Sequence, residues 1–197
     1  MKEYDDFLKG VKAFLKGYNF SKKGGNFIRE SENFYEVINF RQDKYSTKEE
    51  ALFAVNIGVI SKKILEHRKF KFFNNLMHNQ WQTSLSDLVG RNDFWITVNE
   101  TVDMDVLLEQ IKAEFTLFVL PALQKYSDEY YIVEKLWASI DSGKILPFNT
   151  AEDLLILVVK SFPQRIEDAV SLLRSKIKDS NDRLFIAEIM RELNING

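Results

Sequence analysis

Few residues of this chain have the type and spacing that catalysis or metal binding requires. The two histidines, His67 and His78, lie eleven positions apart, and no carboxylate falls one helical step from both. The sequence contains no cysteine, which excludes disulfides, thiolate metal sites and a thiol nucleophile. It also lacks a Gly-x-Ser-x-Gly elbow, a phosphate-binding loop and a dinucleotide fingerprint. We therefore expect no catalytic residue, no metal site and no cofactor.

Acidic side chains leave one enzymatic alternative open. Glu36, Asp43 and Asp87 are scattered along the chain, and a nuclease or phosphotransferase could use them if the fold brought them together. Such an enzyme would show a deep cleft with convergent carboxylates. Because the sequence contains no cluster of acids, we favour a protein without catalytic activity over this alternative.

A basic segment, residues 62–73, combines five basic side chains with three phenylalanines. The basic residues are Lys62, Lys63, Arg68, Lys69 and Lys71. Phosphate contacts and base stacking need this combination, so binding of single-stranded nucleic acid is one interpretation. The interpretation that we favour is an amphipathic lid, whose phenylalanines cap the core while its charges face water.

Four runs of residues alternate apolar and polar side chains, as is typical of antiparallel strands with one buried face. They span residues 26–29, 34–42, 51–60 and 94–99. The first two form a predicted hairpin around Ser31-Glu32-Asn33. The predicted fold class is therefore α+β, with a four-stranded antiparallel sheet that has helices on one face.

The parity of these strands divides the predicted sheet into an apolar and a polar face. The apolar face carries Phe34, Ile38, Phe40, Phe53, Val55, Ile57, Val59, Phe94, Ile96 and Val98. On the polar face, the candidate binding residues are Tyr35, Asn39, Arg41, Asn56, Trp95, Thr97 and Asn99. Open sheets with exposed aromatic side chains bind strands or peptides in several small modules. The alternative is a face that is solvated or covered by the C-terminal helices.

The chain before and between these strands has its own signals. Residues 2–16 repeat apolar side chains every three or four positions, which predicts an amphipathic helix that Gly17 ends. Residues 21–25 are predicted as a loop. Residues 61–89 form a connection too long for a simple turn, and we expect it to be partly helical.

The remainder of the chain is predicted to be helical. A helix over residues 102–126 is expected to be capped by Thr101 and to be kinked or broken near Pro121. Beyond Ser127, amphipathic helices are predicted over residues 128–140, 150–160, 163–178 and 180–193.

The sequence pattern changes from mixed helix and strand to helix alone, which predicts that the chain folds in two parts. Residues 1–127 are expected to form the α+β sheet domain, and residues 128–197 a helical extension that packs on it. Within the extension, Thr150 and Asp153 have the spacing of a capping box.

Net charge and hydropathy limit which partners and which cellular compartment the sequence predicts. The net charge of −2 gives no general attraction to nucleic acid or anionic lipid. Apolar stretches such as 154–159 are much shorter than the roughly 20 residues that span a bilayer. The first six residues include three acids and no apolar stretch, unlike a signal peptide. These features predict a soluble, cytoplasmic protein of bacterial type without a membrane partner.

Three short motifs resemble those of a known family. They are Phe-Leu-Lys-Gly-Tyr-Asn-Phe-Ser-Lys-Lys-Gly at 14–24, Val-Ile-Asn-Phe-Arg-Gln at 37–42 and Phe-Ala-Val-Asn-Ile-Gly-Val at 53–59. Over roughly residues 1–127 the chain is similar to the uncharacterised bacterial family catalogued as domain of unknown function 4304, with further likeness at 85–88 and 94–95. Tyr18, where phenylalanine is commoner, and the basic segment 62–73 depart from its pattern. The resemblance implies an α+β fold and no known activity.

The leading hypothesis is a non-catalytic binding or protein-interaction module, of an immunity-like or partner-sensing kind, with a protein as its favoured partner. It rests on a well-patterned sheet with a mixed polar and aromatic face, in a chain without reaction motifs. The alternatives are the enzyme with scattered carboxylates and the binder of single-stranded nucleic acid through residues 62–73. A flat aromatic face beside a basic rim would favour the nucleic-acid binder.

Overall fold

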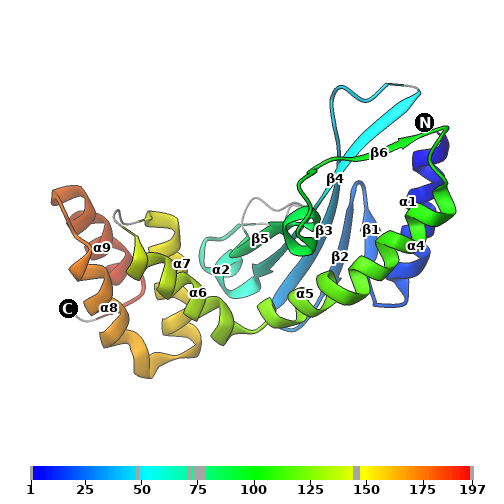
Figure 1. The fold of residues 1–197 in the computed structure, drawn as a ribbon. Helices are drawn as coiled ribbons and strands as arrows, with labels where there is room; N and C mark the ends of the chain where they lie inside the picture. Colours follow the sequence, from blue (N-terminus) through cyan, green and yellow to red (C-terminus); the bar gives the residue numbers. More distant parts are fainter. Residues whose placement is uncertain (1, 48, 71, 73–78, 144–146, 196–197) are drawn as a thin grey trace. The chain divides into compact units, whose positions relative to one another are not determined.

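The computed structural model describes residues 2–47, 49–70, 72, 79–143 and 147–195 (Figure 1). The chain divides into two compact units. Residues 1–60 and 72–127 form the α+β unit, and residues 61–71 and 128–197 form the helical unit. Segment 61–71 therefore groups with the C-terminal helices. The division into a sheet domain of residues 1–127 and a separate helical extension stays a prediction.

The α+β unit is built on an antiparallel sheet, which confirms the predicted fold class. Its six strands are β1 (Ser21–Lys23), β2 (Asn26–Glu30), β3 (Phe34–Gln42), β4 (Glu50–Ser61), β5 (Trp81–Ser84) and β6 (Ile96–Asn99). The order in the sheet is β1-β2-β3-β4-β5, and β6 pairs with β4 (Figure 1). The predicted number of four strands is therefore too low.

Two short strands account for the difference. The three side chains of β1, Ser-Lys-Lys, are all exposed, so this strand has no alternation of apolar and polar residues. The loop predicted for residues 21–25 is therefore wrong over its first three residues. Lysines are common on edge strands because they discourage pairing with another chain. β5 has only four residues, too few to show a period, and lies in the connection 61–89. The helices α2 (Lys62–His67) and α3 (Leu85–Val89) supply the predicted helical part of that connection.

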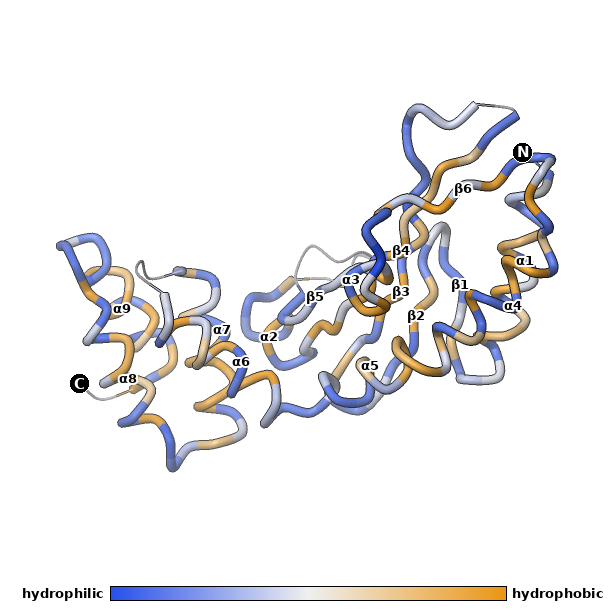
Figure 2. Tube along the Cα trace, viewed as in Figure 1, coloured by the Kyte–Doolittle hydropathy of each residue, from blue (hydrophilic) through white to orange (hydrophobic). Residues whose placement is uncertain are grey.

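The apolar face of the sheet packs against α1 (Lys2–Lys16). The ring of Phe7 lies 5.2 Å from that of Phe53, centroid to centroid. The residues predicted to face the core are buried, except Phe94 and Ile96, which are half-buried. Phe94 differs because β6 starts only at Ile96. Figure 2 shows the hydrophobic positions recurring along α1 and along the strands.

A long helical segment follows the sheet and contains a wider turn. It consists of α4 (Met104–Glu114), the π-helical turn η1 (Phe115–Val119) and α5 (Leu120–Tyr126). The N–H of Leu120 bonds the C=O of Phe115, five residues back. Pro121 has no N–H, and its ring would crowd the carbonyl four residues earlier in a regular helix. The disturbance predicted near Pro121 therefore takes the form of a wider turn just before it.

The starts of two helices differ from the prediction. Asp103, and not Thr101, caps α4, because its carboxylate accepts the N–H groups of Asp105 and Val106 at 3.1 Å. A carboxylate at this place also interacts well with the positive end of the helix dipole. The capping box predicted at Thr150 is wrong, since α7 (Phe148–Ser161) begins two residues earlier.

The helical unit contains α2 and the helices of the C-terminal part of the chain. These are α6 (Glu129–Ser142), α7, the 3₁₀ turn η2 (Pro163–Arg165), α8 (Ile166–Ser175) and α9 (Ser180–Glu192). Residues 154–158 of α7 are all fully buried, as expected for a helix that is hydrophobic on every side. Within the described ranges, no helix combines the length and the apolar character needed to cross a bilayer.

Candidate functional site

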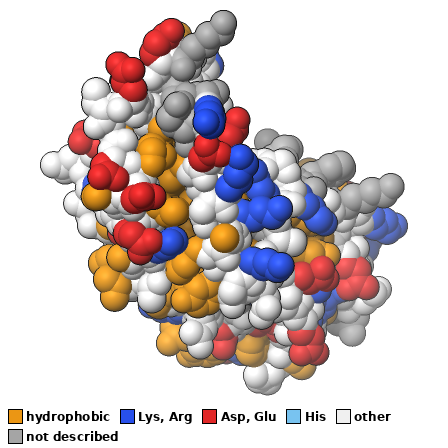
Figure 3. Space-filling view, turned by 90° about the vertical axis from the view of Figure 1, so that its right-hand side faces the viewer, with side chains coloured by type: hydrophobic (Ala, Val, Ile, Leu, Met, Phe, Trp, Pro, Cys, Tyr) orange, Lys and Arg blue, Asp and Glu red, His pale blue; other side chains and the backbone are white. Residues whose placement is uncertain are grey.

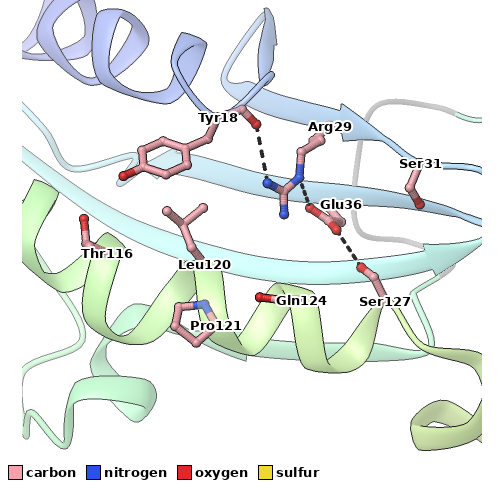
Figure 4. Close-up of a pocket in the computed structure, with 9 residues that line it drawn as sticks. All are labelled: Tyr18, Arg29, Ser31, Glu36, Thr116, Leu120, Pro121, Gln124 and Ser127. Atoms are coloured by element: carbon pink, nitrogen blue, oxygen red, sulfur yellow. Dashed lines mark hydrogen bonds and ion pairs between the residues drawn. The ribbon is translucent and has the colours of Figure 1, made fainter.

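A cleft of about 570 Å³ opens in the α+β unit beside η1 and α5 (Figure 4). Its lining residues are Tyr18, Arg29, Ser31, Glu36, Thr116, Leu120, Pro121, Gln124 and Ser127. The volume falls within the range of roughly 300–1,000 Å³ that is typical of small-ligand pockets. Of these nine residues, Arg29 and Glu36 carry charges, and both point toward α5 in Figure 4.

One wall of the cleft follows from the way α1 ends. The N–H of Phe20 bonds the C=O of Leu15, and the N–H of Asn19 bonds that of Lys16, both at 3.1 Å. These two bonds define a Schellman motif with Asn19 in the left-handed conformation, at φ 64°. α1 ends before Gly17 as predicted, but the left-handed residue is the asparagine and not the glycine. Asparagine adopts this conformation more readily than most side chains do.

The guanidinium of Arg29 is held from three directions. Its Nε lies 2.5 Å from Oε2 of Glu36, which stands directly opposite on β3. Its Nη1 donates to the C=O of Tyr18 at 3.4 Å, and its carbon lies 4.8 Å from the centre of the Phe20 ring. Nη2 has no hydrogen-bond partner within the described residues, and the side chain is 25% exposed. One donor group of Arg29 is therefore available to the cleft.

The carboxylate of Glu36 is buried on the face of the sheet that the helices cover. Its side chain is 4% exposed, and while Oε2 accepts from Arg29, Oε1 accepts from the hydroxyl of Ser127 at 2.7 Å. Ser127 is the residue that ends α5, so the helix terminus sets the place of this hydroxyl. Both partners are needed because an unpaired buried carboxylate is costly.

The π-helical turn η1 forms the opposite wall and carries exposed apolar side chains. Thr116 faces the cleft and donates its hydroxyl to the C=O of Lys112 at 2.9 Å. Its neighbours Leu117 and Phe118 are 67% and 41% exposed. Figure 3 shows hydrophobic side chains in a broken band on the side of the molecule that carries α1 and α4. π-Helical turns are frequent at functional sites, because the wider turn displaces side chains from their regular positions.

This arrangement suits the binding of polar, uncharged groups. Arg29 and Glu36 cancel each other's charge, and Gln124 adds an exposed amide that has no partner in the described part of the chain. Tyr18, Leu120 and Pro121 provide apolar surface beside these groups. Nowhere in the described ranges do three or more His, Asp or Glu side chains gather so that they could hold a metal ion.

The predicted polar face of the sheet carries a row of asparagines. Nδ2 of Asn39 donates to Oδ1 of Asn26 at 2.6 Å, and Nδ2 of Asn56 donates to Oδ1 of Asn39 at 3.4 Å. Tyr35 stacks on Phe72 with ring centroids 4.0 Å apart. Val37, on the same face, is fully buried. The structure therefore shows this face as partly covered around Tyr35 and joined by side-chain amides across three strands.

The other candidate residues of that face lie near its end. The guanidinium of Arg41 lies 5.3 Å from the Trp95 ring and 5.5 Å from the Phe94 ring. Thr97 pairs with Leu52 across β4 and β6. Asn99 donates to Glu50 at 3.3 Å. The structure thus brings Arg41 and Trp95 together, although Trp95 precedes β6, and Asn99 accepts the N–H of Thr101 in the turn that follows.

Two side chains of the basic segment 62–73 form ion pairs within the helical unit. Lys63 donates to Glu129 and to Ser161, at 2.9 Å in each case. Arg68 forms ion pairs with two carboxylates of α7. Lys62 is half-buried, and Lys69 is exposed with a left-handed backbone at φ 54°. Lys71 lies outside the described residues, so two of the five basic residues are shown to be engaged in ion pairs.

The three acids of the enzymatic alternative have separate local roles. Asp43 accepts the N–H of Tyr45 in the turn after β3, and Asp87 completes a capping box with Ser84 at the start of α3. Only Glu36 lines the cleft.

Sequence reasoning missed the cleft, although one signal for it was present. Glu36 stands at an inward position of β3 between Phe34 and Ile38, and Arg29 is inward in β2 next to Phe27. Two opposite charges at facing inward positions of one hairpin predict a buried ion pair. Five of the other lining residues come from the distant helical segment 116–127, and neither they nor Tyr18 and Ser31 carry such a signal.

A family model describes the larger part of this sequence. It matches residues 11–125, more than half of the chain, and is described as a domain of unknown function (DUF4304). The chain belongs to this family. The resemblance found in the sequence motifs is thereby confirmed. The DUF4304 match includes Tyr18, Arg29, Glu36 and Gln124 and stops two residues before Ser127. No curated protein and no solved structure matches the chain.

Proposed function

We propose that the α+β unit is a non-catalytic protein-interaction module and that the cleft, together with the exposed apolar side chains of η1, holds a segment of the partner. The observation that carries this proposal is the exposure of Leu117 and Phe118 on η1, the helical turn whose Thr116 lines the cleft. Exposed apolar side chains on an element that lines a pocket are a frequent feature of interaction surfaces.

The state of Glu36 supports binding over chemistry at this cleft. Both of its oxygens accept hydrogen bonds from neighbouring side chains, and the ion pair with Arg29 fixes the carboxylate in one position. A general acid or base needs a proton that can be exchanged with a substrate. The geometry is instead that of a fixed polar wall, which can present donors and acceptors to a bound chain.

Panning of a random-peptide library against the full chain tests this proposal. Selected peptides are labelled, and their affinity is measured by fluorescence anisotropy. Leu117→Ser should weaken binding by about tenfold or more, because an apolar side chain of this size contributes about 1.5–3 kcal/mol when it is buried in an interface.

Leu184→Ser is the matched control, since Leu184 is 68% exposed and lies on α9 of the helical unit. It should leave peptide binding unchanged. A library that yields no binding peptide, or equal losses in the two variants, contradicts the proposal.

A further inference from the structure

We infer that Arg29 and Glu36 read the main chain of the partner, so that the segment in the cleft is extended and uncharged at the residue that they contact. The C=O of that residue accepts from Nη2 of Arg29, and its N–H donates toward Glu36 and Ser127. This inference rests on the proposed function, because it names the chemistry of the partner at the same cleft.

The donor side is fixed before any ligand binds. Nε and Nη1 of Arg29 are occupied by Glu36 and by the C=O of Tyr18, and the Phe20 ring supports the plane of the guanidinium. The direction of Nη2 is therefore determined by the α1 turn and the β2–β3 hairpin. A donor held in this way loses little side-chain entropy when a carbonyl binds to it.

The groups that can accept a hydrogen bond from the partner lie next to the Arg29 donor. Oε2 of Glu36 accepts from Arg29 and Oε1 accepts from Ser127, and a carboxylate oxygen can accept a second hydrogen bond. The hydroxyl of Ser127 donates to Glu36, so its oxygen can also accept. The cross-strand register places Arg29 beside Glu36, and the hydrogen bond to Glu36 holds Ser127 next to them.

A peptide main chain fits this pattern. In an extended chain, the N–H and C=O of one residue point to the same side, which is how paired antiparallel residues exchange two hydrogen bonds. One residue of the partner can therefore meet the donor and the acceptors together.

The charge balance of the cleft selects against charged groups. A ligand carboxylate near Arg29 also lies near Glu36, and an ammonium near Glu36 also lies near Arg29, because the two side chains are 2.5 Å apart. Each charged group thus meets a like charge and still has to lose its water. A neutral amide meets neither penalty. The apolar surface of Tyr18, Leu120 and Pro121 favours an apolar side chain on the bound residue.

Two small probes test this inference on the full chain. The first is N-acetyl-leucine N′-methylamide, which carries one leucine between two peptide bonds, and the second is N-acetyl-leucine, which ends in a carboxylate. Each is titrated into ¹⁵N-labelled protein while amide chemical shifts are followed. We expect the diamide to shift the signals of residues 17–20, 29–36 and 116–127. The carboxylate should bind at least about tenfold more weakly than the diamide. This comparison uses the unaltered protein and so does not depend on any variant folding.

The Arg29→Lys variant tests the donor itself. Lysine keeps the charge beside Glu36 but lacks the planar fork, so the diamide should bind about tenfold more weakly, the loss expected for a hydrogen bond from a charged donor. Arg183→Lys is the matched control, because Arg183 is an exposed arginine of α9 in the helical unit, outside the cleft, and it should leave binding unchanged.

The outcomes separate this inference from the proposed function. Equal or tighter binding of the carboxylate, or preferential binding of a neutral sugar such as methyl glucoside at the same residues, overturns the main-chain inference. If library peptides bind in a manner that depends on Leu117 but not on Arg29, the interaction module stands and the inference fails. If no peptide binds at all, both fail.

Discussion

Each unit of this protein holds an arginine against a buried carboxylate, yet the two arginines have different surroundings. In the helical unit, Arg68 forms ion pairs with Glu152 and Asp153, the latter at 2.9 Å, and donates to the C=O of Asn149 at 3.4 Å. All three acceptors belong to α7 or its first turn, and the Arg68 side chain is 12% exposed. Its bonds tie the end of α2 to α7.

In the α+β unit, Arg29 has one carboxylate partner and is 25% exposed beside an open cleft. Its charge is balanced by Glu36, and its Nη2 stays accessible to the cleft, whereas the Nε of Arg68, which also has no hydrogen-bond partner within the described residues, is buried. An ion pair therefore does not by itself indicate a binding site. A donor that remains accessible after the pair has formed does indicate one, because only such a donor can bind a further group.

The largest effect is expected at Arg68. Arg68→Met removes the guanidinium that pairs with Glu152 and with Asp153, and Asp153 is 6% exposed as a residue. Breaking a buried pair on one side costs about 3–5 kcal/mol. Urea unfolding followed by the fluorescence of Trp137, which lies on α6, measures the loss in this unit.

Arg183→Met is the control for that experiment, since Arg183 is an exposed arginine of α9. It should change the free energy of unfolding by less than about 0.5 kcal/mol. Peptide binding to the α+β unit should not depend on either variant. A loss below about 1 kcal/mol for Arg68→Met would show that water screens these ion pairs and that Arg68 contributes to stability no more than an exposed arginine does.

A smaller loss, about 3 kcal/mol, is expected for Arg29→Met. Glu36 keeps the hydrogen bond from Ser127, and part of the Arg29 side chain is already in water. The double variant Arg29→Met with Glu36→Leu should recover most of this loss, because a well-packed apolar pair replaces the ion pair. Both variants should fail to bind the selected peptides.

The fluorescence of Trp81 and Trp95 reports unfolding of this unit. Recovery of stability without recovery of binding would separate the structural from the functional role of the pair. A double variant as unstable as Arg29→Met would instead show that the charges support the fold in a way that apolar residues cannot replace.

The sequence was informative where a period is long enough to read. β3 and β4 have nine and twelve residues, and their alternation predicts both the strands and the side chains that face the core. β1 and β5 have three and four residues, so backbone pairing with a neighbour decides their conformation. No local pattern reveals such pairing.

The cleft could be predicted only in part, because three separated segments form it. The facing charges of Arg29 and Glu36 are visible in the hairpin register. Ser127 comes from the end of a helix 91 residues after Glu36, and this contact depends on the wider turn at η1 as well as on tertiary packing. Sequence parity concerns neighbours within a sheet and contains no information on which helical turn lies over them.

Alkaline pH should weaken the α+β unit through a buried tyrosine. Burial, with a smaller effect from Asp5, raises the pKa of Tyr4 to about 12, compared with about 10 in an unfolded chain. The folded state therefore keeps a proton that the unfolded state loses, so stability is unaffected below about pH 10 and falls as the pH rises toward 12. By about pH 11.5 the loss should reach about 2 kcal/mol.

Two tyrosine variants test that pH dependence. Tyr4→Phe should remove this part of the alkaline loss, whereas Tyr45→Phe should not, because Tyr45 is 74% exposed. Urea midpoints measured by the fluorescence of Trp81 and Trp95 at about pH 9 and about pH 11.5 give the difference. Equal pH dependence in wild type and Tyr4→Phe would place the alkaline transition elsewhere in the unit.

The smallest effect on stability is expected from two serines that bond to members of ion pairs, one in each unit. Ser127→Ala removes a donor from the buried carboxylate of Glu36 and should cost about 1 kcal/mol. Ser161→Ala removes an acceptor from Lys63, which keeps Glu129 at 2.9 Å and is 29% exposed, so it should cost less than about 0.5 kcal/mol. Unfolding in urea measures both losses of stability.

Only Ser127→Ala should also weaken binding of the diamide, because the hydroxyl oxygen of Ser127 lies on the acceptor side of the cleft. If the two variants are equal in stability and in binding, Ser127 is a surface cap of α5, and Glu36 alone accepts the partner's N–H.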